Sequence, residues 1–343
     1  MKIGNHDTTL DGVYIIAELS ANHNGSLEVA KQSIQVAKEI GANAVKLQTY
    51  TPDTITLECK NPDFMVGGGT LWDGKSLYEL YKEAMTPWEW HEELFEHARS
   101  VGIDIFSSPF DKSAVDFLEQ FDPSAYKIAS FEITDYELVR YTASKQKPII
   151  ISTGIATLEE IEDTIKICKS VGNSEIVLLK CTSEYPAPLS EANLLTIADM
   201  RDRFGVEVGF SDHTLGITAP VVAVSLGAKV IEKHFILDKS IGGADSGFSL
   251  DKKEFGEMIQ AVRYTEKLLG KVEYELSEKR EHQRRFARSL YVSKDIKKGE
   301  LFSEQNIKSV RPFYGLHPKH LQDVLGKVAK KDYKFGDRLE ASF

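Results

Sequence analysis

The chain has 343 residues, of which 42% are hydrophobic and 27% are charged, an ordinary composition for a globular protein. This length is enough for one large domain and one small domain. The formal net charge of −10 and the lack of a basic run exclude non-specific nucleic-acid binding as an expected function, although local lysines could still bind a phosphorylated small molecule. No apolar stretch approaches the ~18 residues of a membrane span, and no signal-peptide core is evident. Three cysteines without paired spacing indicate reduced thiols, so we expect a cytoplasmic protein.

Eight short apolar runs recur along the first two thirds of the chain and predict β-strands. They are rich in Ile and Val and apolar throughout, which is typical of a parallel sheet covered on both faces. The runs are VYIIAE from Val13, NAVKLQ from Asn43, IDIFSS from Ile103, AYKIAS from Ala125, PIIIST from Pro148, EIVLLK from Glu175, VEVGFS from Val206 and KVIEKH from Lys229.

Amphipathic helical patterns separate these runs, most clearly at residues 26–40, 157–171 and 251–269. Strands that are each followed by a helix predict a (β/α)8 TIM barrel over residues 1–270. A doubly wound open sheet is the alternative, but the first predicted strand is not followed by a G-x-G-x-x-G phosphate turn.

Two segments fall outside the strand–helix repeat. Residues 51–75 form a long insertion, whose apolar residues favour an ordered loop near the barrel mouth, namely Leu57, Phe64, Met65, Leu71 and Trp72. Beyond the barrel, residues 271–286 are strongly charged and indicate a linker, and residues 287–343 contain short β-like runs. We expect a small second domain there, too small to be very stable alone.

The carboxyl ends of the predicted strands carry polar side chains, and barrel enzymes place their chemistry at that face. Lys46 and Lys127 lie in apolar strands, and a buried unpaired lysine is costly unless an anion compensates its charge. Hydroxyls at the other strand ends are good phosphate donors. We therefore expect a pocket for a phosphate and a carboxylate. The polar strand-end residues include Glu18, Gln48, Ser107, Ser108, Ser130, Ser152, Thr153, Thr182, Ser183, Tyr185, Ser211 and Glu232.

Two histidines lie at the ends of the last two predicted strands, His213 just past one and His234 closing the other. Either His213 or His234 alone would more often be a structural histidine, but together they predict a divalent metal site with open coordination positions. Imidazole ligands among oxygen donors favour Mn²⁺, with Mg²⁺ or Co²⁺ as alternatives. Four other histidines follow polar patterns and are expected to be solvated, namely His91, His97, His282 and His320.

Two carboxylates are further candidates for the site. Glu18 ends the first strand and is either a structural anchor or an acid or base of the site. Asp245 lies in the loop after the eighth strand and is either an ordinary loop aspartate or a ligand of a sugar hydroxyl or metal-bound water.

A series of motifs runs through nearly the whole chain in order. They are AELSANHNGS from Ala17, KLQT from Lys46, SSPF from Ser107, YKIAS from Tyr126, STG from Ser152, CTSEYP from Cys181, SDHT from Ser211, EKHF from Glu232 and RP from Arg311. With these motifs the chain resembles the sialic acid synthase family, which condenses phosphoenolpyruvate with an N-acetylated hexose derivative to form a nonulosonic acid.

The resemblance implies a catalytic barrel followed by a small domain similar to type III antifreeze protein, a SAF domain of the β-clip type. It implies a domain-swapped homodimer, in which Arg311 reaches the partner's barrel and faces the sugar. It also implies that His213 and His234 bind Mn²⁺. The phosphate of phosphoenolpyruvate would be held by Lys127, Ser130, Ser152, Ser183 and Ser211, its carboxylate by Lys46 and Ser108, and the sugar by Glu18, Gln48, Tyr185 and Asp245.

Departures within the motifs bear on the choice of sugar. N-acetylneuraminate synthases typically carry Asn where this chain has Ser183, and Glu where it has Asn24. The segments Ser130-Phe131-Glu132 and Gly315-Leu316-His317-Pro318 are most similar to the pseudaminic acid synthases of the family. Their sugar is 2,4-diacetamido-2,4,6-trideoxy-β-L-altropyranose, and the apolar surface of Phe131 would suit a substrate that lacks a hydroxyl.

The expected reaction joins this sugar, phosphoenolpyruvate and water into pseudaminic acid and phosphate by C–O cleavage, with Glu18 acting on the water. The resemblance also suggests that the product modifies surface structures such as flagellin. An N-acetylneuraminate or legionaminate synthase is the alternative within the family. Outside it, a metal-dependent barrel hydrolase or aldolase and a non-catalytic sugar-binding protein remain alternatives.

Overall fold

The computed structural model describes residues 1–67 and 73–340, and the chain divides into two compact units, Met1–Gly270 and Lys271–Phe343. Each unit has a hydrophobic core of its own. Two residues of the predicted ordered loop, Leu71 and Trp72, lie outside the described residues.

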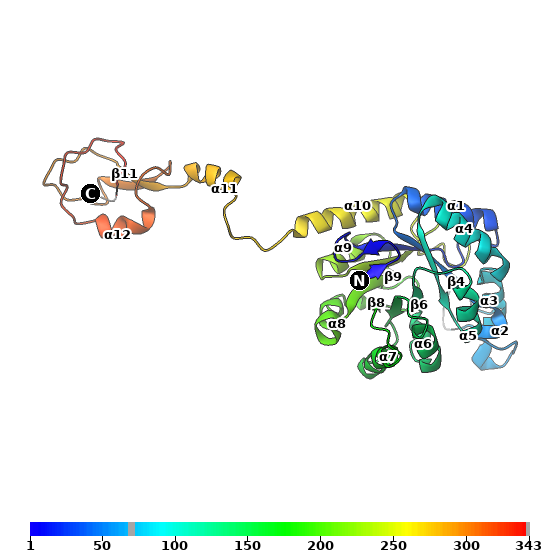
Figure 1. Ribbon diagram of the computed structural model, residues 1–343. Helices are drawn as coiled ribbons and strands as arrows, with labels where there is room; N and C mark the ends of the chain where they lie inside the picture. Colours follow the sequence, from blue (N-terminus) through cyan, green and yellow to red (C-terminus); the bar gives the residue numbers. More distant parts are fainter. Residues whose placement is uncertain (68–72, 341–343) are drawn as a thin grey trace. The chain divides into compact units, whose positions relative to one another are not determined.

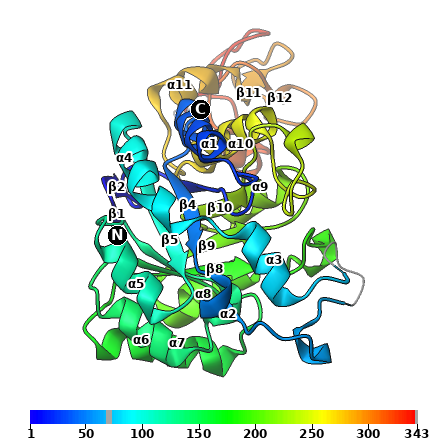
Figure 2. The same cartoon turned by 90° about the vertical axis from the view of Figure 1, so that its right-hand side faces the viewer.

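The first unit is a closed barrel of parallel strands surrounded by helices (Figures 1 and 2). The barrel is closed because β10 pairs with both β9 and β3, so the TIM-barrel prediction is confirmed and the open-sheet alternative is wrong. Over residues 1–67 and 73–270, the barrel strands are β3 (Tyr14–Glu18), β4 (Ala44–Thr49), β5 (Asp104–Pro109), β6 (Tyr126–Ile128), β7 (Ile149–Ser152), β8 (Ile176–Cys181), β9 (Glu207–Asp212) and β10 (Val230–His234).

Helices follow the strands and cover the outside of the barrel. The Thr157 hydroxyl and the Glu160 carboxylate form a reciprocal capping box at the start of α7, which fixes where that helix begins. The helices after the strands are α1 (Leu27–Glu39), α4 (His91–Val101), α5 (Lys112–Glu119), α6 (Tyr136–Ala143), α7 (Leu158–Ser170), α8 (Thr196–Phe204), α9 (Thr218–Ser225) and α10 (Lys252–Leu269). The insertion after β4 adds α2 (Pro52–Ile55) and α3 (Leu77–Ala84). Short 3₁₀ turns are η1 (Pro62–Phe64), η2 (Trp88–Trp90), η3 (Ser130–Glu132), η4 (Leu189–Glu191) and η5 (Lys239–Ile241).

Alternation along the strands separates the barrel interior from the layer beneath the helices. On β3, Tyr14 and Ile16 belong to the interior cluster, whereas Ile15 and Ala17 pack toward the helices. A two-residue period carries this alternation to the strand ends, so the next inward position on β3 is Glu18. The middle of the interior is thus apolar, and the inward-facing carboxylates Glu18 and Glu232 lie near the carboxyl ends of β3 and β10.

An N-terminal hairpin closes the apolar end of the interior. Strands β1 (Lys2–Ile3) and β2 (His6–Asp7) pair antiparallel, and Ile3 is fully buried in the interior cluster beside Tyr14. The sequence did not predict this hairpin, because strands of two residues leave no periodic pattern.

Lys233 and Asp212 form an ion pair between β10 and β9, and both side chains are fully buried. Truncating one partner leaves the other charge buried and unpaired. We therefore expect Asp212→Ala to lower the free energy of unfolding by about 3–5 kcal/mol, measured by urea denaturation. Asp202→Ala removes the exposed partner of Arg201 and should cost less than about 1 kcal/mol. Equal losses in the two variants would contradict a structural role for the buried pair.

The second unit contains a small antiparallel pair, β11 (Ser289–Val292) and β12 (Ile307–Val310), around a core of its own. Its helices are α11 (Glu278–Gln283) and α12 (Leu321–Val324), with the 3₁₀ turns η6 (Arg284–Phe286) and η7 (Pro318–His320). The predicted linker, residues 271–286, therefore contains a short exposed helix. In the described part of the chain, no helix is both long and apolar enough to cross a membrane.

Candidate active site

Two buried lysines meet two buried glutamates at the carboxyl end of the barrel. Lys46 Nζ lies 2.6 Å from Glu18 Oε2 and 3.8 Å from Glu232 Oε1. Lys127 Nζ lies 3.9 Å from the same Glu232 oxygen. Each lysine therefore has a carboxylate neighbour within the protein, because β3 and β10 present their carboxylates in the same inward layer, and the predicted anion pocket stays a prediction. Glu232, a strand-end residue without a predicted role, links the two lysines.

The charges in this cluster shift one another's pKa values. Burial raises the pKa of Glu18 to about 7, with Glu232 adding to the effect and Lys46 opposing it. Burial alone would lower the pKa of Lys46, but Glu18 and Glu232 more than offset it and the pKa is raised. A carboxyl group that titrates near neutrality can exchange a proton during a reaction.

Lys127 is hydrogen-bonded to one of three serine hydroxyls that lie at or just after the ends of β6, β7 and β8. Its Nζ donates to Ser152 Oγ at 2.6 Å and to the Ile128 carbonyl at 3.0 Å. Ser130 Oγ is buried without a hydrogen-bond partner, and Ser183 Oγ lies 3.9 Å from the Cys181 thiol. A lysine with three nearby strand ends that carry hydroxyls is a suitable seat for a phosphate group.

A second group of hydroxyls lies beside Lys46 and Glu232. Lys46 Nζ is 3.4 Å from Ser108 Oγ, and Ser211 Oγ donates to Glu232 Oε1 at 3.0 Å. Lys46 and Ser108 therefore offer adjacent donors for a carboxylate, while Ser211 is joined to the lysine cluster through Glu232.

Gln48 binds the Glu18 carboxylate oxygen that does not contact Lys46. Its Nε2 donates to Glu18 Oε1 and to Ser20 Oγ, both at 2.9 Å. Glu18 thus lies between a cation and an amide, and its carboxylate orientation is set from both sides.

The two predicted metal-binding histidines lie side by side, with ring centroids 5.4 Å apart. His213 Nδ1 is 2.9 Å from the Thr182 carbonyl and so carries a proton, which leaves Nε2 as the nitrogen that could bind an ion. Burial would lower the pKa of His213, but the Cys181 thiol and the Thr182 carbonyl more than offset it and the pKa is raised. An ion at Nε2 would therefore have to displace a proton from this ring. His234 Nδ1 is buried without a hydrogen-bond partner and lies 3.7 Å from Asp245 Oδ2. Burial, followed by the nearby positive charges, lowers the pKa of His234 well below its usual range, so this ring is neutral.

The donor set fits a metal with few protein ligands. Among the described residues, no three His, Cys, Asp or Glu side chains are grouped to hold an ion. A neutral imidazole with an orphaned buried nitrogen, beside a second imidazole, would suit a catalytic ion whose other positions stay open.

Two aromatic rings pack against the histidines. The Tyr185 ring lies 4.4 Å from that of His213, and the Phe248 ring lies 4.8 Å from that of His234. The sequence predicted Tyr185 but missed Phe248, which is buried in the loop after β10. The two rings pack together 5.2 Å apart and form an apolar wall beside the imidazoles.

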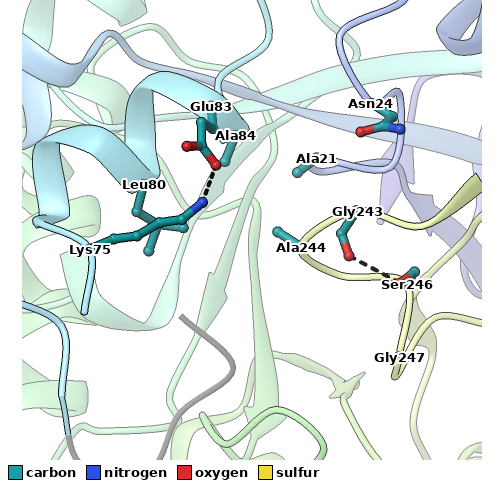
Figure 3. A pocket seen from close by; sticks show the side chains of 10 residues that line it. All are labelled: Ala21, Asn24, Lys75, Leu80, Glu83, Ala84, Gly243, Ala244, Ser246 and Gly247. Atoms are coloured by element: carbon teal, nitrogen blue, oxygen red, sulfur yellow. Dashed lines mark hydrogen bonds and ion pairs between the residues drawn. The ribbon is translucent and has the colours of Figure 1, made fainter. Parts of the chain in front are cut away.

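A cavity of about 480 Å³ opens at the barrel mouth (Figure 3). Helix α3 contributes one side, with Leu80, Glu83 and Ala84, and residues 243–247 lie across from it. Asp245 belongs to this facing loop, and its Oδ2 accepts a hydrogen bond from the Ala21 N–H, at 3.4 Å. Asp245 therefore connects the loop that lines the cavity with His234, whose Nδ1 lies 3.7 Å from its Oδ2.

Arg311, Phe131 and His91 lie outside the lysine and histidine clusters. Arg311 is exposed directly after β12 in the second unit, so its role at a barrel stays a prediction. Phe131 is 56% exposed in η3, next to Ser130, and offers an apolar surface there. The expectation of a solvated His91 is wrong, because this residue is fully buried and bonded to Thr49 Oγ1 at 2.8 Å.

A closed barrel with paired lysines and paired histidines at its carboxyl end has the architecture of a barrel enzyme. Residues 33–274 match the NeuB family, and residues 287–339 match the SAF domain. The chain therefore belongs to the NeuB family, the sialic acid synthase family that its motifs predict, and it carries a C-terminal SAF domain.

Named relatives extend over almost the whole chain. Pseudaminic acid synthase from Campylobacter jejuni is 57% identical over 340 residues, covering 99% of this chain and 98% of that protein. Pseudaminic acid synthase from Helicobacter pylori is 51% identical over 328 residues, covering 95% and 96%. The solved structure of the Bacillus subtilis spore coat polysaccharide biosynthesis protein SpsE is 34% identical, with a TM-score of 0.67 and coverage of 99% and 97%.

Proposed function

We propose that this chain is a pseudaminic acid synthase. It condenses phosphoenolpyruvate with 2,4-diacetamido-2,4,6-trideoxy-β-L-altropyranose and water, and it releases pseudaminic acid and phosphate. The observation that carries the proposal is identity of 51–57% over nearly the full chain to proteins of that name. The lysine and histidine clusters supply the chemistry that this reaction needs.

Phosphoenolpyruvate carries two anionic groups, and the barrel offers two cationic seats. Lys127, with Ser130, Ser152 and Ser183 around it, holds the phosphate group. Lys46, with Ser108 at 3.4 Å, holds the carboxylate. Binding at both seats fixes the orientation of the enol between them.

Glu18 acts on water once the carbon–carbon bond has formed. C3 of phosphoenolpyruvate adds to the aldehyde carbon of the open-chain sugar, and water adds at C2. Glu18 takes the proton of that water, because its pKa of about 7 lets it act as a base at neutral pH. The bond between C2 and the bridging oxygen then breaks as the new C2 hydroxyl loses its proton and becomes a ketone, and Lys127 stabilises the departing phosphate. Of the two protons that water brings, one ends on the former aldehyde oxygen, which becomes a hydroxyl, and the other ends on the phosphate.

His213 and His234 would hold one divalent ion, for which Mn²⁺ is the ion that we favour. The ion would supply Lewis-acid polarisation of the aldehyde oxygen. Tyr185 and Phe248 keep water away from the imidazoles on the side of their apolar wall.

The cavity beside α3 and the exposed Phe131 ring provide room and apolar surface for the acetamido and 6-deoxy groups of the sugar.

The test of the proposed function is phosphate release from phosphoenolpyruvate with Mn²⁺ and three sugars: the altrose sugar, its manno-configured stereoisomer and N-acetylmannosamine. Release with the altrose sugar alone is the expected result. Release with another sugar alone would reassign the chain to legionaminate or N-acetylneuraminate synthesis, and release with none would favour a hydrolase or a binding protein.

The proposal includes a homodimer with exchanged small domains, in which Arg311 completes the partner's site, and a cytoplasmic reaction that supplies surface structures such as flagellin. A small unit joined through an exposed charged segment supports such an exchange. The barrel cluster described above offers lysines but no guanidinium for the sugar.

Mixed dimers test the exchange directly. His213→Ala and Arg311→Ala chains, each inactive as homodimers, should together form dimers with one intact site. Doubly tagged mixed dimers should therefore recover about half of the wild-type activity. If Arg311 acted only within its own chain, the mixed dimers would be as inactive as the two parents.

A further inference from the structure

Gly154 takes no direct part in the proposed reaction, yet its lack of a side chain shapes the phosphate seat. It follows the end of β7, two residues after Ser152. A Cβ atom on Gly154 would lie 2.4 Å from Ser183 Oγ and 2.6 Å from Ser130 Oγ, distances that real Cβ atoms essentially never show. Its φ lies outside the left-handed region, so the backbone would accept alanine and only the space requires glycine.

Two hydroxyls thus converge over the Cα of Gly154 from different strand ends. Ser130 follows β6, and Ser183 follows β8. Ser130 Oγ is buried without a partner, and the contact of Ser183 Oγ with the Cys181 thiol, at 3.9 Å, is long and weak. Ser183 is half-buried, but the buried Ser130 hydroxyl costs stability unless it is satisfied, which points to a ligand as its missing acceptor.

We propose that Gly154 is a positioning residue for the phosphate of phosphoenolpyruvate. The absent side chain lets the Ser130 and Ser183 hydroxyls lie next to each other and donate to the same phosphate, close to Lys127 and Ser152. An alanine would push both hydroxyls away from this arrangement. The inference rests on the proposed function, which assigns the phosphate to this seat.

The test is calorimetric binding of phosphoenolpyruvate to the full chain with Mn²⁺ and without sugar. Gly154→Ala should weaken binding by about 10- to 100-fold, the loss expected when two hydrogen bonds to a charged group are displaced. The KM for the sugar should stay within about twofold, since the sugar does not use these hydroxyls. Gly256→Ala is the matched control, because Gly256 lies in α10 without a left-handed φ, and a Cβ there would meet no atom within 4 Å beyond the adjacent backbone of its own helix.

A double-mutant cycle separates positioning from general damage. In a Ser130→Ala/Ser183→Ala background the hydroxyls are already absent, so adding Gly154→Ala should weaken binding by less than about threefold. Any one of three results would overturn the inference. The first is wild-type affinity for phosphoenolpyruvate in Gly154→Ala. The second is an equal loss of this affinity in the wild-type and double-alanine backgrounds, and the third is an equal loss for phosphoenolpyruvate and for the sugar. A wild-type chain that binds no phosphoenolpyruvate would instead overturn the proposed function, and the inference with it.

Discussion

Replacing His213 with alanine should reduce metal-dependent condensation by about 10³-fold or more, because Lewis-acid stabilisation by a bound ion is worth several kcal/mol. The loss should appear in phosphate release and in Mn²⁺ binding alike. His213 is one of two adjacent imidazoles, and its Nδ1 proton is engaged by the Thr182 carbonyl. Alanine therefore removes the single nitrogen that this ring can offer to an ion.

Two controls make this result interpretable. His282→Ala removes an exposed histidine of α11 and should leave turnover and Mn²⁺ binding unchanged. Circular dichroism should show that His213→Ala keeps the barrel folded. Turnover near the wild-type rate in folded His213→Ala would show that His213 is not a ligand of a catalytic ion.

Replacing Lys127 with methionine should lower kcat/KM for phosphoenolpyruvate by roughly 10²–10³-fold. Methionine keeps much of the length of the side chain but removes the charge that faces the phosphate. The substitution also leaves Glu232 with one lysine partner instead of two, and this extra negative charge repels the substrate. Steady-state kinetics at saturating sugar measure the effect.

Lys147→Met is the matched control, because Lys147 precedes β7 at the opposite end of the barrel and pairs with Asp122 on the surface. Its kcat/KM should stay within about twofold of the wild-type value. Equal kinetics for Lys127→Met and the control would contradict a phosphate seat at Lys127.

Periodicity explains why the barrel and most of the site were predictable. The eight apolar runs became the eight barrel strands with ends shifted by one or two residues. Polar residues near the carboxyl ends of apolar barrel strands lie at the catalytic face, so Lys46, Lys127 and His234 could be assigned to it from the sequence. The alternation that sends Lys233 outward to Asp212 also sends Glu232 inward with His234.

The missed features depend on tertiary contacts rather than on local pattern. Glu232 was visible at a strand end, but its contact with both lysines follows from how β10 closes the barrel against β3. His91 begins a polar-looking helix, yet Thr49 and the surrounding aromatic rings bury it. Phe248 lies in a glycine-rich loop without a period, and only the folded loop brings it to His234.

The most direct test of the proposed chemistry is the fate of the oxygen that bridges C2 and phosphorus. Phosphoenolpyruvate labelled with ¹⁸O at this position would be turned over with Mn²⁺ and the altrose sugar, and both products would be analysed by mass spectrometry. Cleavage of the C2–O bond should place the label in inorganic phosphate and leave the pseudaminic acid unlabelled. Label retained in the sugar acid, or phosphate released without a condensed product, would contradict C–O cleavage at this site.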